Sequence, residues 1–208
     1  EEFGVASTDI EWVAVGYLLS LAAMIPVAGW LADRFGSKRV FVTALVGFVS
    51  ISLACGAAQT LDQLVTLRVL QGIGGGLLTP VGSAMLFRAY PMAERAKAAI
   101  GVLSVVVIAP AIGPVLGGIL VDQASWRWIF FINGPMGAVA IALGVLWLRG
   151  RATDDSTEGV AGRFDTAGFL LSAIAVSVLI YTLTIGPEEG WISPKVLGLA
   201  TVGIVAAV

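Results

Sequence analysis

One arginine lies inside a long apolar segment of the sequence. Arg68 falls near the start of the run Leu64–Phe87, and Gln71 follows it by three residues. A charge in hydrocarbon is costly unless it faces a polar cavity or a partner, and residues three apart share one face of a helix. Arg68 and Gln71 therefore predict the polar element of an internal cavity. The alternative is an arginine that snorkels to the membrane surface, because the run begins four residues before it.

A charged break separates two other apolar runs. It covers Gly29–Arg39 and has the form G-x-L-A-D-R-x-G-x-K-R, with three basic residues, Arg34, Lys38 and Arg39. A turn inside lipid would expose unpaired backbone groups, so the break lies at a water interface, and its basic residues favour the cytoplasmic side. We expect Gly29 to admit a neighbouring helix and Gly36 to permit a tight turn. We expect Asp33 to pair with Arg34 or Arg39, or to face the N-terminus of another helix. The alternative is a simple positive anchor with a turn glycine.

Glycines and prolines predict two sites of close helix packing. Gly72 and Gly76 have the G-x-x-x-G spacing that lets two helices approach. The run Ala98–Val121 combines two prolines, each of which removes a helix hydrogen bond, with glycines that remove bulk: Pro110, Gly113, Pro114, Gly117 and Gly118. We expect that helix to kink and to pack tightly. The alternative is a kinked helix with a purely structural role.

Composition argues against other functional classes. The 208 residues include 58% hydrophobic and 12% charged residues, against about a quarter charged in soluble domains. The net charge of −2 does not suggest nucleic-acid binding. The chain has no histidine, and its one cysteine, Cys55, lies mid-run as a small buried side chain. We therefore predict no catalytic residues, no metal site and no cofactor, and hence no enzyme.

The elements that hold these residues are helices long enough to cross a bilayer, since about 20 apolar residues suffice. The sequence predicts six complete spans and part of a seventh: Trp12–Ala32, Val40–Gln59, Leu64–Phe87, Ala98–Val121, Trp128–Leu148, Thr166–Gly186 and Val196–Val208. Nine of the 12 basic residues lie in the breaks at 33–39, 88–97 and 149–165, which places these loops in the cytoplasm and the acidic N-terminal tail outside. We expect a piece of a longer, multi-pass protein of the inner (plasma) membrane.

The motifs resemble those of the major facilitator superfamily. The break at 29–39 resembles its signature loop, which implies that Gly29, Asp33, Arg34, Gly36, Lys38 and Arg39 form a conformational latch between two helix bundles. Arg68-x-x-Gln71-Gly72 resembles its fourth-helix motif, which implies a role in proton coupling. Ala109–Gly118 is similar to its fifth-helix antiporter motif G-x-x-x-G-P-x-x-G-G, with Ala109 in place of the first glycine.

Two segments resemble the fourteen-helix drug:proton antiporter branch of that superfamily. The stretch Trp126–Pro135 is similar to the start of its sixth helix, with Trp126 and Arg127 at the outer interface. The segment Phe164–Gly168, the apolar run after it and Gly186–Trp191 resemble its extra seventh helix. The resemblance implies an all-α helical bundle without its first helix: residues 1–148 as helices two to six, a cytoplasmic loop at 149–165, and an extra helix pair at 166–208.

On this resemblance we expect a secondary active transporter that exports lipophilic or cationic compounds by alternating access in exchange for protons. Its partners would be an amphipathic small molecule, protons and the lipid bilayer. Apart from Asp33 at the inner edge, no carboxylate lies within a predicted span, so the proton carrier is not named. The alternatives are an importer or facilitator of a small solute with the same fold, a membrane-embedded enzyme, and a non-transporting sensor or scaffold.

Overall fold

The computed structural model describes residues 7–148 and 164–207, and every regular element in these ranges is a helix. In chain order the helices are α1 (Ser7–Phe35), α2 (Ser37–Gly56), α3 (Leu61–Ala89), α4 (Arg95–Gln123), α5 (Trp128–Phe131), α6 (Asn133–Trp147), α8 (Thr166–Glu189) and α9 (Pro194–Ala207). Within the described residues, six segments are long and apolar enough to cross a membrane, and α9 is a shorter apolar helix. The predicted all-α, multi-pass fold is confirmed. Residues 149–163 of the predicted cytoplasmic loop lie outside the described residues.

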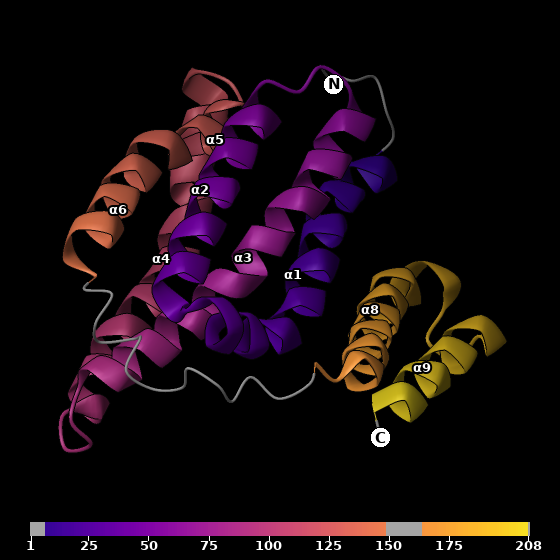
Figure 1. Cartoon of the computed structure of the whole chain (residues 1–208). Coiled ribbons are helices and arrows are strands. Elements are labelled where there is room, and N and C mark those ends of the chain that lie inside the picture. The colour runs from indigo at the N-terminus through magenta and orange to yellow at the C-terminus, as the bar shows by residue number, and fades with distance from the viewer. Residues whose placement is uncertain (1–6, 149–163, 208) are drawn as a thin grey trace.

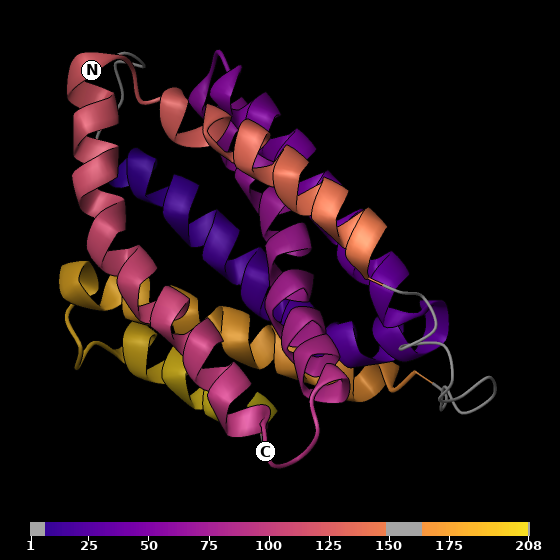
Figure 2. The same cartoon turned by 90° about the vertical axis from the view of Figure 1, so that its left-hand side faces the viewer.

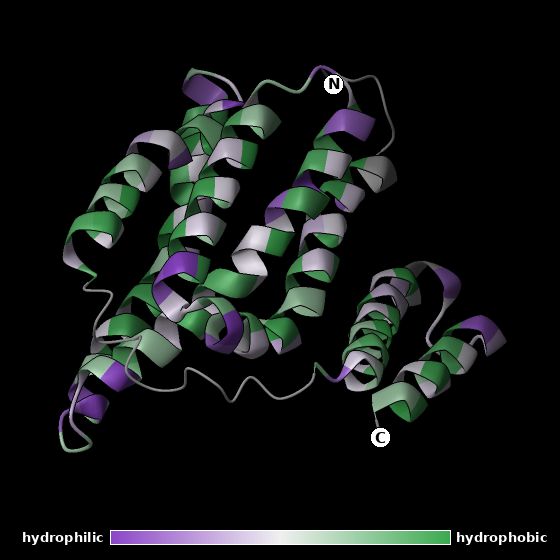
Figure 3. Ribbon diagram, in the orientation of Figure 1, coloured by the Kyte–Doolittle hydropathy of each residue, from purple (hydrophilic) through white to green (hydrophobic). Residues whose placement is uncertain are grey.

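The helices form one bundle with a separate pair at its side (Figure 1). α1, α2 and α3 pack on one another, and α5 and α6 lie against α2. α8 and α9 pack together, and α8 contacts α1 on the side away from α6. Figure 3 shows hydrophobic residues along the length of the helices and most hydrophilic residues at their ends and connecting turns. This distribution is expected of a chain whose helix shafts lie in lipid.

Small residues make the contacts between the three central helices. Where α1 and α2 cross α3, the buried core contains Ala28, Ala32 and Ala44 together with Val40, Leu77 and Val81. Lipid tails are as apolar as these side chains, so close van der Waals packing, rather than hydrophobic burial, stabilises such crossings. A β-carbon added at Gly74 would lie 3.1 Å from the Ala44 carbonyl oxygen. The backbones of α2 and α3 can therefore approach closely at this point.

The predicted single span at 128–148 divides into two helices. α5 ends at Phe131 and α6 begins at Asn133, with a turn at Ile132. The cause lies in Pro135, which has no N–H to donate to the Phe131 carbonyl and whose ring crowds that carbonyl. A polar pair supports the break: Asn133 Nδ2 donates to Ser52 Oγ at 3.0 Å, and Ser52 Oγ donates to the Phe130 carbonyl at 3.0 Å. The two short helices together still have the length of one span.

α4 makes few contacts with the other described helices. It runs as one helix across Pro110 and Pro114, and its ribbon bends part-way along (Figure 2). None of its residues is buried, and among the described helices it packs on α5. β-carbons added at Gly113, Gly117 and Gly118 would meet no atom within 4 Å. No described helix lies against the glycine face, so tight packing of this face stays a prediction.

Candidate functional site

Arg68 points into the bundle from the first half of α3. Its Nη1 donates to Gln71 Oε1 at 2.8 Å, and its Nε donates to the Val13 carbonyl of α1 at 3.1 Å. Its guanidinium carbon lies 4.0 Å from the centre of the Tyr17 ring and 5.7 Å from that of Phe130. Three helices thus surround the cation, which contacts two aromatic faces and two oxygens. This geometry disagrees with a side chain that extends away from the bundle to the membrane surface.

Gln71 connects Arg68 to the interior of the bundle. Its side chain is only 1% exposed, and its Oε1 accepts the hydrogen bond from Arg68. The thiol of Cys55, which is fully buried on α2, lies 4.0 Å from the same oxygen and makes at most a weak contact. A buried amide oxygen without a partner would be costly, so Arg68 also stabilises the position of Gln71. No carboxylate contacts Arg68 within the part of the chain that the structure describes.

The glycines next to Gln71 bring α1 close to this site. A β-carbon at Gly72 would overlap Ser20 Oγ and lie 2.5 Å from the Tyr17 carbonyl oxygen. A β-carbon at Gly76 would overlap the Leu21 carbonyl oxygen and lie 2.8 Å from Met24 Cβ. Both glycines therefore face α1, as their spacing predicted. The close approach places the Val13 carbonyl and the Tyr17 ring within reach of Arg68.

The turn between α1 and α2 contains the predicted latch residues. Gly36 has a φ of 87°, a conformation that L-residues with a side chain rarely adopt, so glycine makes this one-residue turn possible. Asp33 does not pair with Arg34 or Arg39. Arg88, at the end of α3, donates to Asp33 Oδ1 at 3.4 Å and to Ser37 Oγ at 3.3 Å. The predicted pairing with Arg34 or Arg39 is wrong because the last turn of α3, which is 55 residues away in the sequence, lies beside this turn.

Gly29 and Lys38 are two further residues of the predicted latch. A β-carbon at Gly29 would meet nothing within 4 Å, so no helix in the described ranges packs on it, and the close helix approach expected at Gly29 stays a prediction. Lys38 Nζ donates to the Val145 carbonyl in the last turn of α6 at 3.1 Å. This contact places a cation at the negative end of a helix dipole. Arg34 and Arg39 are exposed and have no ion-pair partner among the described residues.

The Asp33–Arg88 pair allows a test of the latch. Both side chains are more than 40% exposed, so the pair is worth at most about 1 kcal/mol, or about a fivefold shift in a conformational equilibrium. We expect Asp33→Asn and Arg88→Gln to cause similar shifts, and the double variant to shift no further than either. State-specific cross-linking of the intact polypeptide measures the populations. Additive shifts in the double variant would show that Asp33 acts with another partner.

The whole chain, residues 1–208, matches the Major Facilitator Superfamily. The chain belongs to this superfamily. Curated relatives carry the name "Putative multidrug resistance protein MdtD". The chain is 41% identical to the protein from Klebsiella pneumoniae over 208 residues, which is 99% of the chain and 42% of the relative. It is 42% identical to that from Yersinia enterocolitica, over 93% of the chain and 40% of the relative, and 38% identical to that from Escherichia fergusonii, over 43% of the relative. The chain thus spans about two fifths of the length of these proteins.

Membership in the Major Facilitator Superfamily places the chain in a family of transporters rather than enzymes. Among the described residues, no group of three His, Cys, Asp or Glu side chains could hold a metal ion. The buried polar residues of the described helices are Gln71 beside Arg68, Ser52 beside Asn133, Ser37 at the start of α2 and Thr182 in α8, and Arg68 adds a charge to the first of these places. The candidate functional site of this superfamily chain is therefore the Arg68 cluster, which we define as Val13, Tyr17, Arg68, Gln71 and Phe130.

The sequence did not indicate every residue that supports the site. Arg127 was predicted only at the outer interface, yet its Nη1 donates to the carbonyls of Gly56 and Ala58 at the end of α2. Its guanidinium carbon also lies 4.7 Å from the centre of the Trp126 ring. The last carbonyl groups of a helix have no hydrogen-bond donors within that helix, and Arg127 supplies donors to them at the end of α2. Tyr17 and Arg88 were missed as well, and only their aromatic and basic character could have suggested them.

Proposed function

We propose that this chain forms the first bundle of a secondary active transporter that exports lipophilic or cationic compounds in exchange for protons. The observation that carries the proposal is the Arg68 cluster, a permanent cation held inside the bundle by α1, α3 and α5. Polar groups inside a membrane are costly, and those that persist line pathways for substrates or ions. The MdtD relatives, whose name refers to multidrug resistance, support drug export as the direction of transport.

Arg68 would tune proton transfer without carrying the proton itself. A guanidinium does not lose its proton in a protein, so a carboxylate must bind and release the transported proton. Within the described spans, Asp33 at the inner end of α1 is paired with Arg88. The other carboxylates of the described spans, Glu11, Asp62 and Asp122, lie near helix ends. The proposal therefore assigns the proton-binding carboxylate to another part of the polypeptide. A cation nearby would favour the charged form of that carboxylate.

The proposed mechanism is alternating access, in which two helix bundles rock about a central site. The turn at 33–39 would act as a latch on the cytoplasmic side, because its Asp33–Arg88 pair is exposed and can break at low cost. In this orientation the loops at 33–39, 88–97 and 149–165 are cytoplasmic, the N-terminal tail is outside, and the protein lies in the inner membrane. The nine basic residues of these loops support that orientation.

Reconstitution of the intact polypeptide into vesicles tests the proposal. With an acidic lumen, adding the lipophilic cation ethidium should release protons from vesicles whose cytoplasmic loops face outward, and ethidium should accumulate inside. Proton and ethidium would then move in opposite directions. Movement in the same direction would indicate an importer, and ethidium movement without a proton gradient would indicate a facilitator. The orientation is checked by the accessibility of a tag in the 149–165 loop of intact cells. Labelling of the tag from outside would contradict a cytoplasmic loop.

A further inference from the structure

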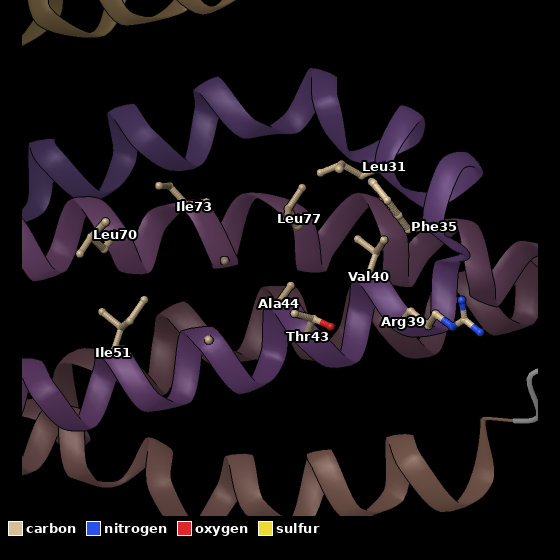
Figure 4. A pocket seen from close by; sticks show the side chains of 12 residues that line it. Leu31, Phe35, Arg39, Val40, Thr43, Ala44, Ile51, Leu70, Ile73 and Leu77 are labelled. Atoms are coloured by element: carbon tan, nitrogen blue, oxygen red, sulfur yellow. The ribbon is translucent and has the colours of Figure 1, made fainter. Parts of the chain in front are cut away.

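An apolar groove of about 350 Å³ runs along the surface where α2 lies beside α3, with the last turns of α1 at one end (Figure 4). Its walls include Val40 and Ile51 of α2 and Leu70 and Leu77 of α3, and Phe35 of α1 lies at the end near the turn. Leu70 and Phe35 are 44% and 54% exposed. Gly47 forms part of the wall, and a β-carbon there would meet nothing within 4 Å, so the missing side chain leaves the groove open.

Among the described residues that line the groove, the two with polar side chains lie toward one end. Arg39 marks that end, and Thr43 lies one helical turn further along α2, while Ile51 and Leu70 lie at the opposite end (Figure 4). Within the described ranges, neither side chain makes a hydrogen bond or ion pair. The groove therefore has a cation and a hydroxyl toward the end near the α1–α2 turn and apolar walls toward the other end.

The local charge favours an anion. Arg88 neutralises Asp33, and Lys38 is held by the Val145 carbonyl at the end of α6. Arg34 and Arg39 remain as unpaired cations of the turn among the described residues. Both would repel the cationic substrates of the proposed function. They would attract the phosphate of a lipid in the cytoplasmic leaflet, where anionic lipids collect.

The length of the groove matches one leaflet. Arg39 and Ile51 are twelve residues apart on α2, which corresponds to about 18 Å along the helix axis. Half of the hydrocarbon core of a bilayer is about 15 Å thick. A phosphate at Arg39 would therefore place an acyl chain along the apolar walls as far as the membrane midplane.

We propose that this groove binds one anionic phospholipid of the leaflet that the α1–α2 turn faces. Its phosphate accepts hydrogen bonds from the Arg39 guanidinium and the Thr43 hydroxyl, and one acyl chain fills the groove between α2 and α3. The bound lipid occupies the space that Gly47 leaves open. Because it lies against the turn that contains Asp33, the lipid also contributes to the position of that turn.

Native mass spectrometry of the intact polypeptide in detergent, titrated with dioleoylphosphatidylglycerol, tests the proposal. We expect one tightly bound lipid per polypeptide and weaker binding of dioleoylphosphatidylcholine. Arg39→Gln should lower the affinity for phosphatidylglycerol about fivefold and leave that for phosphatidylcholine unchanged. The control Lys97→Gln removes an exposed cation at the start of α4, outside the groove, and should change neither affinity.

A substitution that fills the groove provides a second, independent test of the proposal. Gly47→Leu should lower the affinity for phosphatidylglycerol at least tenfold, whereas Gly198→Leu, at an equally open glycine of α9, should not. sn-Glycerol 3-phosphate should not compete, because it lacks the acyl chain. Equal binding of both lipids, competition by glycerol phosphate, or no effect of Arg39→Gln would overturn the proposal. So would the absence of a tightly bound lipid, which is the result expected if another helix of the polypeptide covers the groove.

Discussion

Replacing Arg68 by alanine will lower drug-dependent proton flux about 100-fold, because hydrogen bonds that involve a charged group contribute about 1.5–3 kcal/mol each and about 2.7 kcal/mol corresponds to that factor in rate. The substitution removes the permanent cation from between the Tyr17 and Phe130 rings. It also leaves Gln71 Oε1, in a side chain that is 1% exposed, with only the weak contact of the Cys55 thiol. The measurement is proton release from vesicles on addition of ethidium, normalised to the amount of protein in the membrane.

Two further variants separate the charge from its structural role. Arg68→Lys keeps the charge but lacks the planar group that reaches Val13 and Gln71 together, so we expect a smaller loss, about tenfold. In the double variant Arg68→Met with Gln71→Leu, an apolar pair of similar volume replaces the polar one, and such exchanges often preserve stability. We expect a stable but inactive protein. Wild-type flux in this double variant would show that the Arg68 cluster takes no part in transport.

Replacing Gly76 by alanine will destabilise the bundle by about 2 kcal/mol or more, since over-packing a tight contact costs about 1–3 kcal/mol and this contact involves backbone. The new β-carbon would overlap the Leu21 carbonyl oxygen and lie 2.8 Å from Met24 Cβ. Neither group can rotate away, so α1 and α3 must separate. Thermal unfolding of the intact polypeptide in detergent measures the loss.

The same separation of α1 from α3 would change the contacts of the Arg68 cluster. Val13 and Tyr17 belong to α1, and their contacts with Arg68 depend on the distance between α1 and α3. We therefore expect Gly76→Ala to impair transport as well as stability. Gly101→Ala on α4 is the matched control, because a β-carbon there meets nothing within 4 Å and alanine favours a helix over glycine. Equal melting temperatures for Gly76→Ala and the wild type would contradict the packing argument.

Short-range features of this protein were predictable from the sequence. The positions of the spans depend on hydropathy and length, and the described helices lie within a few residues of the predicted ones. Arg68 and Gln71 share a helix face because their spacing of three residues is set by the helix itself. The turn at Gly36 was also predictable, because a positive φ is a local property of the backbone.

Contacts between helices were decided only by the tertiary structure. Asp33 pairs with Arg88 rather than with its sequence neighbours, Lys38 reaches the end of α6, and Arg127 reaches the end of α2. The glycine face of α4 was expected to pack, and no described helix covers it. Hydropathy marks a helix as membrane-spanning but does not determine its rotation or its neighbours, because lipid and other helices are almost equally apolar surroundings. Those choices depend on the fit of whole helix surfaces, such as Gly72 and Gly76 against α1, which residues distant in the sequence determine together.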